Sequence, residues 1–162
     1  MSDSYYDLAQ ICQNGHVINS MARDYPNSNQ DHCDRCGAPT IMACPSCNTG
    51  IRGYYHVPGV FGVDRYTAPA FCYKCGEPFP WTASGLIAAE ALTEELEGLT
   101  NDERQSLKKS LNDLIRETPN TRVAETRFKR LMKKVGKDGY ESMRSILTDI
   151  VSETVRKTLF GP

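Results

Sequence analysis

The pattern of apolar residues changes once along this 162-residue chain, after Thr82. Up to that point only fifteen residues are Ile, Leu, Val, Met or Phe, and short apolar runs alternate with turn signals such as Asn14-Gly15. Such alternation predicts brief β-strands, which we place at Leu8–Ile11, Val17–Met21, Arg52–Val57 and Ala70–Tyr73. A segment with so few apolar residues builds little core, and small domains of this kind usually depend on a metal or on disulfides.

After Thr82 the chain contains 22 such apolar residues in 80, and they recur with a helical period. The period predicts helices, separated by glycines and by a Thr-Pro-Asn break, at about Ser84–Glu97, Thr100–Glu117, Arg122–Val135 and Gly139–Leu159. Thr100 with Glu103 has the form of a capping box, and Asp138 with Glu141 repeats that spacing. Connections this short favour antiparallel neighbours, so we expect a bundle of about four helices.

Seven cysteines, all in the first 82 residues, are the strongest chemical signal. The N-terminal residues have neither the basic nor the apolar segment of a signal peptide, and no apolar run approaches the roughly 18 residues of a membrane span. We therefore expect a cytoplasmic protein that does not contact membranes, in which thiols stay reduced. The odd count and the tight spacings also disfavour a disulfide framework, and they predict metal ligation.

The more specific of two predicted sites pairs two Cys-x-x-Cys knuckles, Cys44/Cys47 and Cys72/Cys75. Two intervening residues make a tight turn, so that both sulfurs and the amides between them face one ion. Gly76 eases the second turn because it tolerates unusual backbone angles. Two such knuckles complete a tetrahedral shell of four thiolates, which is a typical zinc site.

The other predicted site joins the knuckle Cys33/Cys36 to a turn in which three residues separate Cys12 from His16. An Asn-Gly pair supplies that turn. Three thiolates and one imidazole then close the shell. If His16 is only a solvated turn residue, His32 next to Cys33 is the substitute ligand.

Spacing alone leaves the pairing of these half-sites open. We expect sequential pairing, in which each half-site finds its partner on the next hairpin. The alternative is a cross-brace, as in RING-type domains, which joins Cys33/Cys36 to Cys72/Cys75 and Cys12/His16 to Cys44/Cys47. Either arrangement fills each shell with four protein ligands, whereas a catalytic zinc normally keeps one position open for water. The sequence therefore predicts two structural Zn²⁺ ions.

Together these patterns predict an α+β protein, with a tandem zinc-ribbon region in residues 1–82 and a helical domain in residues 83–162. The formal charge of −1 is divided between −2 for the first region and +1 for the second. Two thiolate-bound zinc ions lower the first to about −5. Nucleic-acid binders generally carry a basic footprint, so this acidity disfavours nucleic-acid binding through the ribbons.

Several segments within residues 5–82 have a distinctive sequence together with the cysteines; they are Tyr6–Cys12, Asn14–Ser20, Asn29–Gln30, Ile51–Val60 and Cys75–Thr82. With these segments the first half resembles a bacterial family of proteins with a domain of unknown function and a double zinc-ribbon N-terminal half. The resemblance implies a bacterial cytoplasmic protein with ribbon-type zinc sites, and it implies no particular activity.

One segment outside the ligands combines a cation, two phenols and an imidazole between glycines. Aromatic and arginine side chains make strong contacts at protein interfaces, so we regard this segment as a candidate recognition surface formed by Arg52, Tyr54, Tyr55 and His56. The alternative interpretation is that alternate residues of the segment pack onto the ribbon sheet.

A second candidate surface is the predicted helix near residues 122–137, which has seven basic residues and one acidic residue. The candidate phosphate contacts are Arg122, Arg127, Lys129, Arg130, Lys133, Lys134 and Lys137. The alternative is that these charges form the solvated side of an amphipathic helix.

The sequence contains no nucleophile motif and no phosphate-binding loop, so we expect no enzyme and no small-molecule substrate. We interpret the chain as a non-enzymatic zinc-binding adaptor that binds a protein partner within a bacterial multi-component system. The alternative is a nucleic-acid-binding zinc-ribbon protein that uses the basic helix 122–137.

Overall fold

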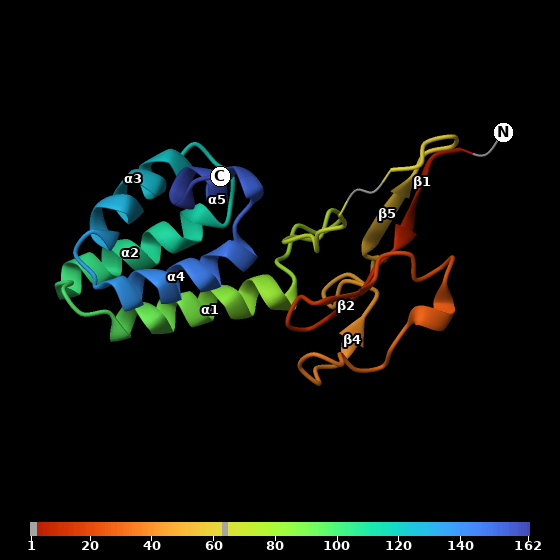
Figure 1. Cartoon of the computed structure of the whole chain (residues 1–162), viewed down its shortest axis with the longest axis horizontal. Helices are drawn as coiled ribbons and strands as arrows, with labels where there is room; N and C mark the ends of the chain where they lie inside the picture. Colours follow the sequence, from red (N-terminus) through yellow and green to blue (C-terminus); the bar gives the residue numbers. More distant parts are fainter. Residues whose placement is uncertain (1–2, 63–64) are drawn as a thin grey trace. The chain divides into compact units, whose positions relative to one another are not determined.

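The computed structural model describes residues 3–62 and 65–162. The chain divides into two compact units, Met1–Thr82 and Ala83–Pro162. Short antiparallel strands belong to the first unit, and helices fill the second (Figure 1). The α+β class predicted from the sequence is therefore confirmed.

Within residues 3–62 and 65–82, five short strands form two small sheets. In the two-stranded sheet, β1 (Tyr5–Leu8) pairs with β5 (Arg52–His56). In the three-stranded sheet, β2 (Gln10–Cys12) lies between β3 (Val17–Asn19) and β4 (Thr40–Ile41). A single 3₁₀ turn, η1, lies between β3 and β4 at Pro26–Ser28.

The strand predicted at Ala70–Tyr73 is wrong, because the chain there forms only an isolated bridge between Phe71 and Pro78. The physical reason is the knuckle that starts at Cys72, whose N–H donates to the carbonyl of Glu77 and turns the chain back. The predicted strand Leu8–Ile11 is divided between β1 and β2 at Ala9.

The buried core of the first unit is small, and four of its residues are cysteines, Cys12, Cys33, Cys44 and Cys72. Phe79 stacks on Trp81 with ring centroids 4.8 Å apart, and the indole N–H donates to the carbonyl of Pro69 at 2.9 Å. One cluster of this core consists of Ala9, Ile11, Cys44, Ile51, Cys72, Phe79 and Trp81. A core of this size buries little apolar surface, and cysteine side chains make up much of it.

In the described part of the chain the second unit contains five helices, where the sequence predicted about four. They are α1 (Pro80–Glu95, which begins in the first unit), α2 (Asn101–Leu114), α3 (Thr121–Met132), α4 (Lys137–Ile150) and α5 (Glu153–Phe160). The predicted last helix, Gly139–Leu159, is in fact two. Ser152 separates them because its side chain accepts a hydrogen bond from the N–H of Val155 and so begins α5.

Of the two capping boxes predicted from the sequence, one is present and one is not. The capping box is confirmed, with Thr100 and Glu103 each bonded to the other's backbone N–H. The box predicted for Asp138 is wrong, because α4 starts earlier and has Gly136 as an N-cap without a side-chain bond. Gly136 therefore begins α4 rather than ending α3.

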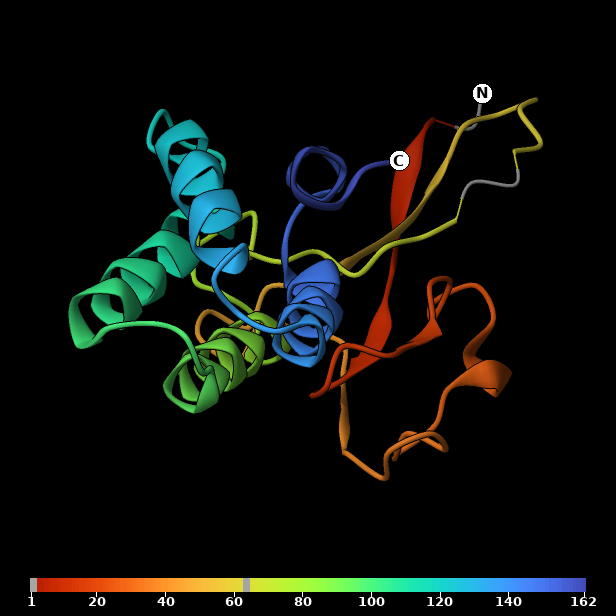
Figure 2. The same ribbon diagram turned by 60° about the vertical axis from the view of Figure 1, so that its left-hand side comes forward.

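Close contacts fix how the helices of the second unit pack. A Cβ at Gly85 would lie 2.3 Å from Ile150, and one at Gly139 would lie 2.8 Å from Leu96, so α1 and α4 run antiparallel in close contact. The helices α2 and α3 lie side by side (Figures 1 and 2). The large, fully buried apolar side chains of this unit are Leu107, Leu111, Leu114, Phe128, Leu131, Met143, Leu147 and Val155. In the described part of the chain, none of the helices has the length and apolar character needed to cross a bilayer.

Candidate metal centres

The first candidate centre brings together Cys12, His16, Cys33 and Cys36. The Nδ1 atom of His16 lies 3.5 Å from the sulfurs of both Cys12 and Cys33, and the sulfurs of Cys12 and Cys36 are 3.7 Å apart. Zinc binds sulfur at about 2.3 Å and imidazole nitrogen at about 2.0–2.1 Å, so tetrahedral edges are about 3.8 Å between sulfurs and about 3.5 Å from sulfur to nitrogen. The observed separations fit a tetrahedral zinc shell.

The second candidate centre brings together Cys44, Cys47, Cys72 and Cys75. The sulfurs of Cys44 and Cys75 are 3.7 Å apart, and those of Cys47 and Cys72 are also 3.7 Å apart. These separations again match the edges of a zinc–thiolate tetrahedron. They are far from the roughly 2.05 Å of a disulfide bond, and all seven cysteines are free thiols.

The structure therefore groups the half-sites in chain order and not as a cross-brace. Each centre combines ligands that neighbour one another along the chain. His32, the substitute considered for His16, is exposed and forms an isolated bridge with Pro39 outside the cluster.

All three Cys-x-x-Cys knuckles have the same backbone geometry. The carbonyl of the first cysteine accepts a hydrogen bond from the N–H four residues later, and the residue at that position has a positive φ: Gly37 (75°), Asn48 (61°) and Gly76 (79°). Asn48 takes the place of glycine in the middle knuckle, because asparagine tolerates the left-handed conformation better than other side chains. The shared turn places both sulfurs of a knuckle on one side of the chain.

Backbone and side-chain donors lie around the sulfurs. The N–H of Arg35 donates to the sulfur of Cys33 at 3.4 Å, and the N–H of Lys74 donates to that of Cys72 at 3.4 Å. The backbone at Ala38, followed by the side chain of Asn14, lowers the pKa of Cys36 to about 6. Donors of this kind favour the thiolate, which is the form that binds a metal.

Thr49 has the same effect in the second centre, where its hydroxyl and then its backbone lower the pKa of Cys47 to about 6. The first cysteine of each knuckle is buried, whereas Cys36, Cys47 and Cys75 are exposed. Both centres thus lie at the surface of the first unit, yet each has four protein ligands to fill a tetrahedral shell.

The fold and these clusters define an α+β protein whose first unit has two cysteine-rich centres that can hold zinc. Residues 5–159 match the model of a family described as an uncharacterised protein conserved in bacteria (DUF2321), and the chain belongs to that family. The match continues through the helices, beyond the residues 5–82 that carry the resemblance in the sequence. No curated protein and no solved structure matches the chain.

The candidate recognition residues Arg52, Tyr54, Tyr55 and His56 all lie on β5, but they do not form one surface. The guanidinium of Arg52 lies between two tyrosines, 4.7 Å from the ring centroid of Tyr6 and 3.6 Å from that of Tyr73. His56 instead approaches Asp7 and Asp24. The sequence did not indicate that Tyr6 and Tyr73 contact Arg52, because both lie far from it along the chain. The pairing of β1 with β5 brings Tyr6 to Arg52, and the last knuckle brings Tyr73.

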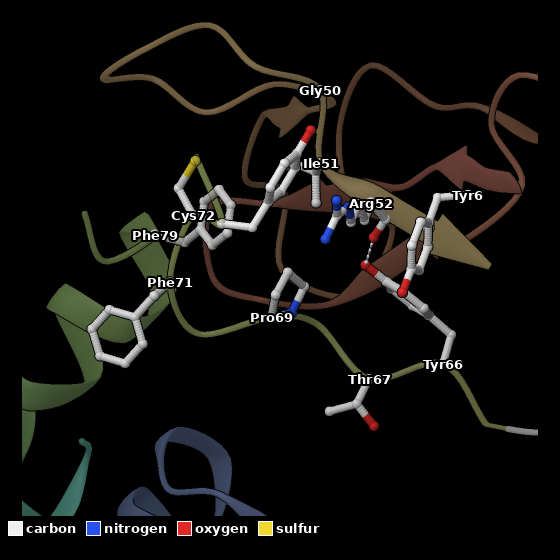
Figure 3. Close-up of a pocket in the computed structure, with 12 residues that line it drawn as sticks. Tyr6, Gly50, Ile51, Arg52, Tyr66, Thr67, Pro69, Phe71, Cys72 and Phe79 are labelled. Atoms are coloured by element: carbon white, nitrogen blue, oxygen red, sulfur yellow. Dashed lines mark hydrogen bonds between the residues drawn. The ribbon is translucent and has the colours of Figure 1, made fainter. Parts of the chain in front are cut away.

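Arg52 and its neighbours line a cavity of about 260 Å³ in the first unit (Figure 3). The hydroxyl of Tyr66 donates to the carbonyl of Arg52 at 2.5 Å and holds the cavity wall to β5. Burial raises the pKa of Tyr66. The side chains around the cavity are mostly apolar or aromatic, and they include Tyr6, Ile51, Pro69, Phe71, Tyr73 and Phe79.

The seven candidate phosphate contacts do not all lie on one helix, and some of them are bonded to other side chains of the chain. Arg127 donates to the hydroxyl of Ser110 at 3.1 Å, and Lys134 forms an ion pair with Glu103. The helix α3 ends at Met132, so Lys137 belongs to α4. The exposed basic residues of this region are Arg122, Lys129, Arg130, Lys133, Lys134 and Lys137.

Proposed function

We propose that the first unit holds two structural zinc ions. The observation that carries the proposal is the spacing of the ligand atoms, which fits the edges of a zinc tetrahedron: sulfur–nitrogen 3.5 Å and sulfur–sulfur 3.7 Å in the first centre, and sulfur–sulfur 3.7 Å in the second. Each centre offers four protein ligands and leaves no position for water, as in structural rather than catalytic zinc sites. On this basis the metal acts as a scaffold.

Metal analysis of the purified, folded protein tests this proposal. We expect two zinc ions per chain, and fewer than about 1.5 would contradict it. Replacement of one ligand from each centre, Cys36→Ser and Cys75→Ser in separate proteins, is expected to remove about one zinc ion each. Ser46→Ala, which changes a residue of the middle knuckle that is not a ligand, is the matched control and keeps both.

We further propose that the zinc-bound unit is a non-enzymatic interaction module within a bacterial multi-component system. Its contact surface is the Arg52 groove, which we define as Tyr6, Arg52, Tyr66 and Tyr73. Tyr6 is 45% exposed and Tyr73 is 55% exposed, and both rings flank a guanidinium. Tyrosine and arginine are the residues that most often dominate binding energy at protein interfaces.

The charge around Arg52 indicates the chemistry of the partner. Among residues 3–62 and 65–162, no carboxylate lies within ion-pair distance of the Arg52 guanidinium. A partner segment that places a carboxylate on Arg52 and an apolar side chain in the cavity satisfies both features. An extended acidic-apolar peptide is therefore the class of ligand that we propose for the groove.

Selection from a displayed peptide library, with the zinc-loaded full chain as bait, tests the groove. We expect the selected peptides to pair an acidic with an apolar residue, and to bind Arg52→Ala at least about thirtyfold more weakly, as for an interface hot spot. Tyr25→Ala removes another exposed tyrosine of the same unit and is expected to bind normally. Equal binding to Arg52→Ala, or no selection above background, would contradict the proposal.

The nucleic-acid alternative rests on the exposed basic residues of α3 and the turn that follows it. Its support is weaker, because Lys134 is paired with Glu103 and Arg127 with Ser110. Retention on nucleic acid that falls steeply with salt, and that is lost when Lys129, Arg130, Lys133 and Lys134 are neutralised, would favour it over the interaction module.

A further inference from the structure

A third group of metal-binding side chains lies at the β1–β5 pair, apart from the two cysteine centres. It consists of Asp7 on β1, His56 at the end of β5 and Asp24 in the turn before η1. The Nε2 atom of His56 lies 3.6 Å from Oδ2 of Asp7 and 3.5 Å from Oδ2 of Asp24. Two carboxylates and an imidazole thus point at one place.

The carboxylate of Asp7 is the decisive member, because its side chain is fully buried. Its Oδ1 atom accepts hydrogen bonds from the N–H groups of Leu8 at 2.6 Å and Arg23 at 2.9 Å. Its Oδ2 atom is buried and has no hydrogen-bond partner in the described part of the chain, and the same is true of Nε2 of His56. A buried carboxylate oxygen left without a partner is strongly unfavourable unless a cation compensates it.

The distances distinguish two ways of compensating this charge. A protonated His56 that donates to the carboxylates is expected at about 2.7–2.9 Å, shorter than the 3.5 and 3.6 Å observed. Ligands that each lie about 2.1 Å from a shared metal ion are instead separated by about 3.0 Å at octahedral angles and by about 3.4 Å at tetrahedral angles. The observed spacing therefore fits three ligands around an ion better than an ion pair.

Neighbouring aromatic residues hold the ligands in this arrangement. The hydroxyl of Tyr5 donates to Oδ2 of Asp24 at 2.7 Å, and its ring stacks on His56 with centroids 4.7 Å apart. The ring of Tyr54 packs edge-on against the imidazole of His56, with centroids 4.8 Å apart. Hydrogen bonds and packing of this kind around the ligands are typical supports of metal sites.

We propose that Asp7, Asp24 and His56 form a third metal site, which binds one divalent first-row transition cation. Carboxylate oxygens with one imidazole suit such ions, and they differ from the thiolates of the two zinc centres. Asp24 and His56 are 33% and 26% exposed at the side chain, so the site opens to solvent, and three protein ligands leave coordination positions for water. This site goes beyond the proposed function and does not depend on it.

Titration with Mn²⁺ tests the site, with free Mn²⁺ followed by electron paramagnetic resonance. The starting protein is the full chain that metal analysis shows to hold two zinc ions, one in each cysteine centre, because excess zinc would also occupy the third site. Mn²⁺ prefers oxygen ligands and ranks below zinc in affinity, so the thiolate centres keep their zinc. We expect one Mn²⁺ bound per chain with unchanged zinc content. The absence of bound Mn²⁺ would overturn the proposal.

Variants show whether the bound ion lies at these residues. Asp7 also accepts two backbone hydrogen bonds, so the more exposed ligands are the better targets: Asp24→Asn and His56→Gln are both expected to lose the bound Mn²⁺. Asp31→Asn removes an exposed carboxylate of the same unit and is the matched control. Equal Mn²⁺ binding by Asp24→Asn and the control would overturn the assignment.

The hydroxyl of Tyr5 supports a ligand without being one, so its contribution to Mn²⁺ affinity can be measured separately. Tyr5→Phe removes only the hydroxyl that donates to Asp24, and it is expected to weaken Mn²⁺ binding at least about tenfold. Tyr6→Phe makes the same chemical change at the next residue of β1 and is expected to leave binding unchanged. The same affinity in both variants would contradict the supporting role of Tyr5.

Discussion

The two units of this protein have similar lengths but differ in what encloses their interiors. In the second unit the fully buried side chains are mostly leucines and other apolar residues from α2 to α5, such as Leu107, Leu111 and Leu147. In the first unit the core includes Cys44 and Cys72, and few large aliphatic residues accompany them. One unit thus buries a mainly aliphatic core, whereas the ligands of the other converge on two points. If these points hold the proposed zinc ions, the first unit depends on metal for its stability and the second does not.

Removal of zinc is the change to which the two units are expected to respond most differently. Structural zinc contributes about 10 kcal/mol per site, which is comparable to the whole stability of a small domain. A strong chelator is therefore expected to unfold residues 1–82 and to leave the helices folded. Trp81, the single tryptophan, reports on the first unit through a red shift of its emission, and far-ultraviolet circular dichroism reports on the helices.

Restoring zinc is the control, and it is expected to restore the emission of Trp81. Loss of the helical signal in step with the fluorescence change would show that the units do not differ in this way. An unchanged emission spectrum after complete zinc removal would show that the first unit does not need the metal.

Phe128→Ala is the complementary change in the second unit. This side chain is 1% exposed and meets Phe160 edge-on with centroids 6.0 Å apart. The cavity is expected to cost about 3–5 kcal/mol, measured by thermal or urea unfolding of the helices, with zinc content unchanged. Val123→Ala, at a 57% exposed position on the same helix, is the control, and a similar loss in both variants would contradict the expectation.

Gly53→Ala is expected to have a smaller effect, confined to the first unit. A Cβ there would lie 2.2 Å from the carbonyl oxygen of Ser20 and 2.8 Å from the backbone of Leu8, and backbone atoms yield little. Overpacking of this kind costs about 1–3 kcal/mol, which Trp81 emission in a urea titration measures. Gly62→Ala has only an ordinary contact with Tyr54, so it should leave the midpoint nearly unchanged.

The smallest predicted effect concerns the capping box of α2. Thr100→Ala removes the hydroxyl that accepts from the N–H of Glu103 at 3.2 Å, and it is expected to cost about 1 kcal/mol of helical stability. Asn120→Ala is the comparison, because Asn120 occupies the N-cap of α3 without a side-chain bond. Equal destabilisation of the two variants in thermal unfolding would show that the box contributes nothing specific.

Local signals explain what the sequence predicted well. The helical period and the box at Thr100 act within a few residues, and so does the Cys-x-x-Cys spacing that groups the cysteines of each knuckle. Where a local signal competes with a neighbouring one, the prediction was wrong. The run Ala70–Tyr73 has β-forming residues, but the knuckle at Cys72 determines its path, and the serine cap at Ser152 divides the last helix.

Features that depend on distant parts of the chain were not predictable. Spacing left the pairing of half-sites open, because sequential and cross-braced arrangements use the same knuckles. The group of Asp7, Asp24 and His56 has no spacing signal at all. It depends on the register of β1 with β5, which places Tyr5 opposite His56, and on the turn that carries Asp24.

The contact of Gly15 with Trp81 has a consequence for synthesis on the ribosome. Gly15 lies in the turn between Cys12 and His16, and a Cβ at this position would lie 2.9 Å from that of Trp81. The turn therefore cannot reach its final packing until residue 81 has left the exit tunnel, which takes several seconds at about 5–20 residues per second. During part of that interval Cys44 and Cys47 have no ligand partners, because Cys72 and Cys75 have not yet emerged, and the survival of these two thiols depends on the reducing power of the surroundings.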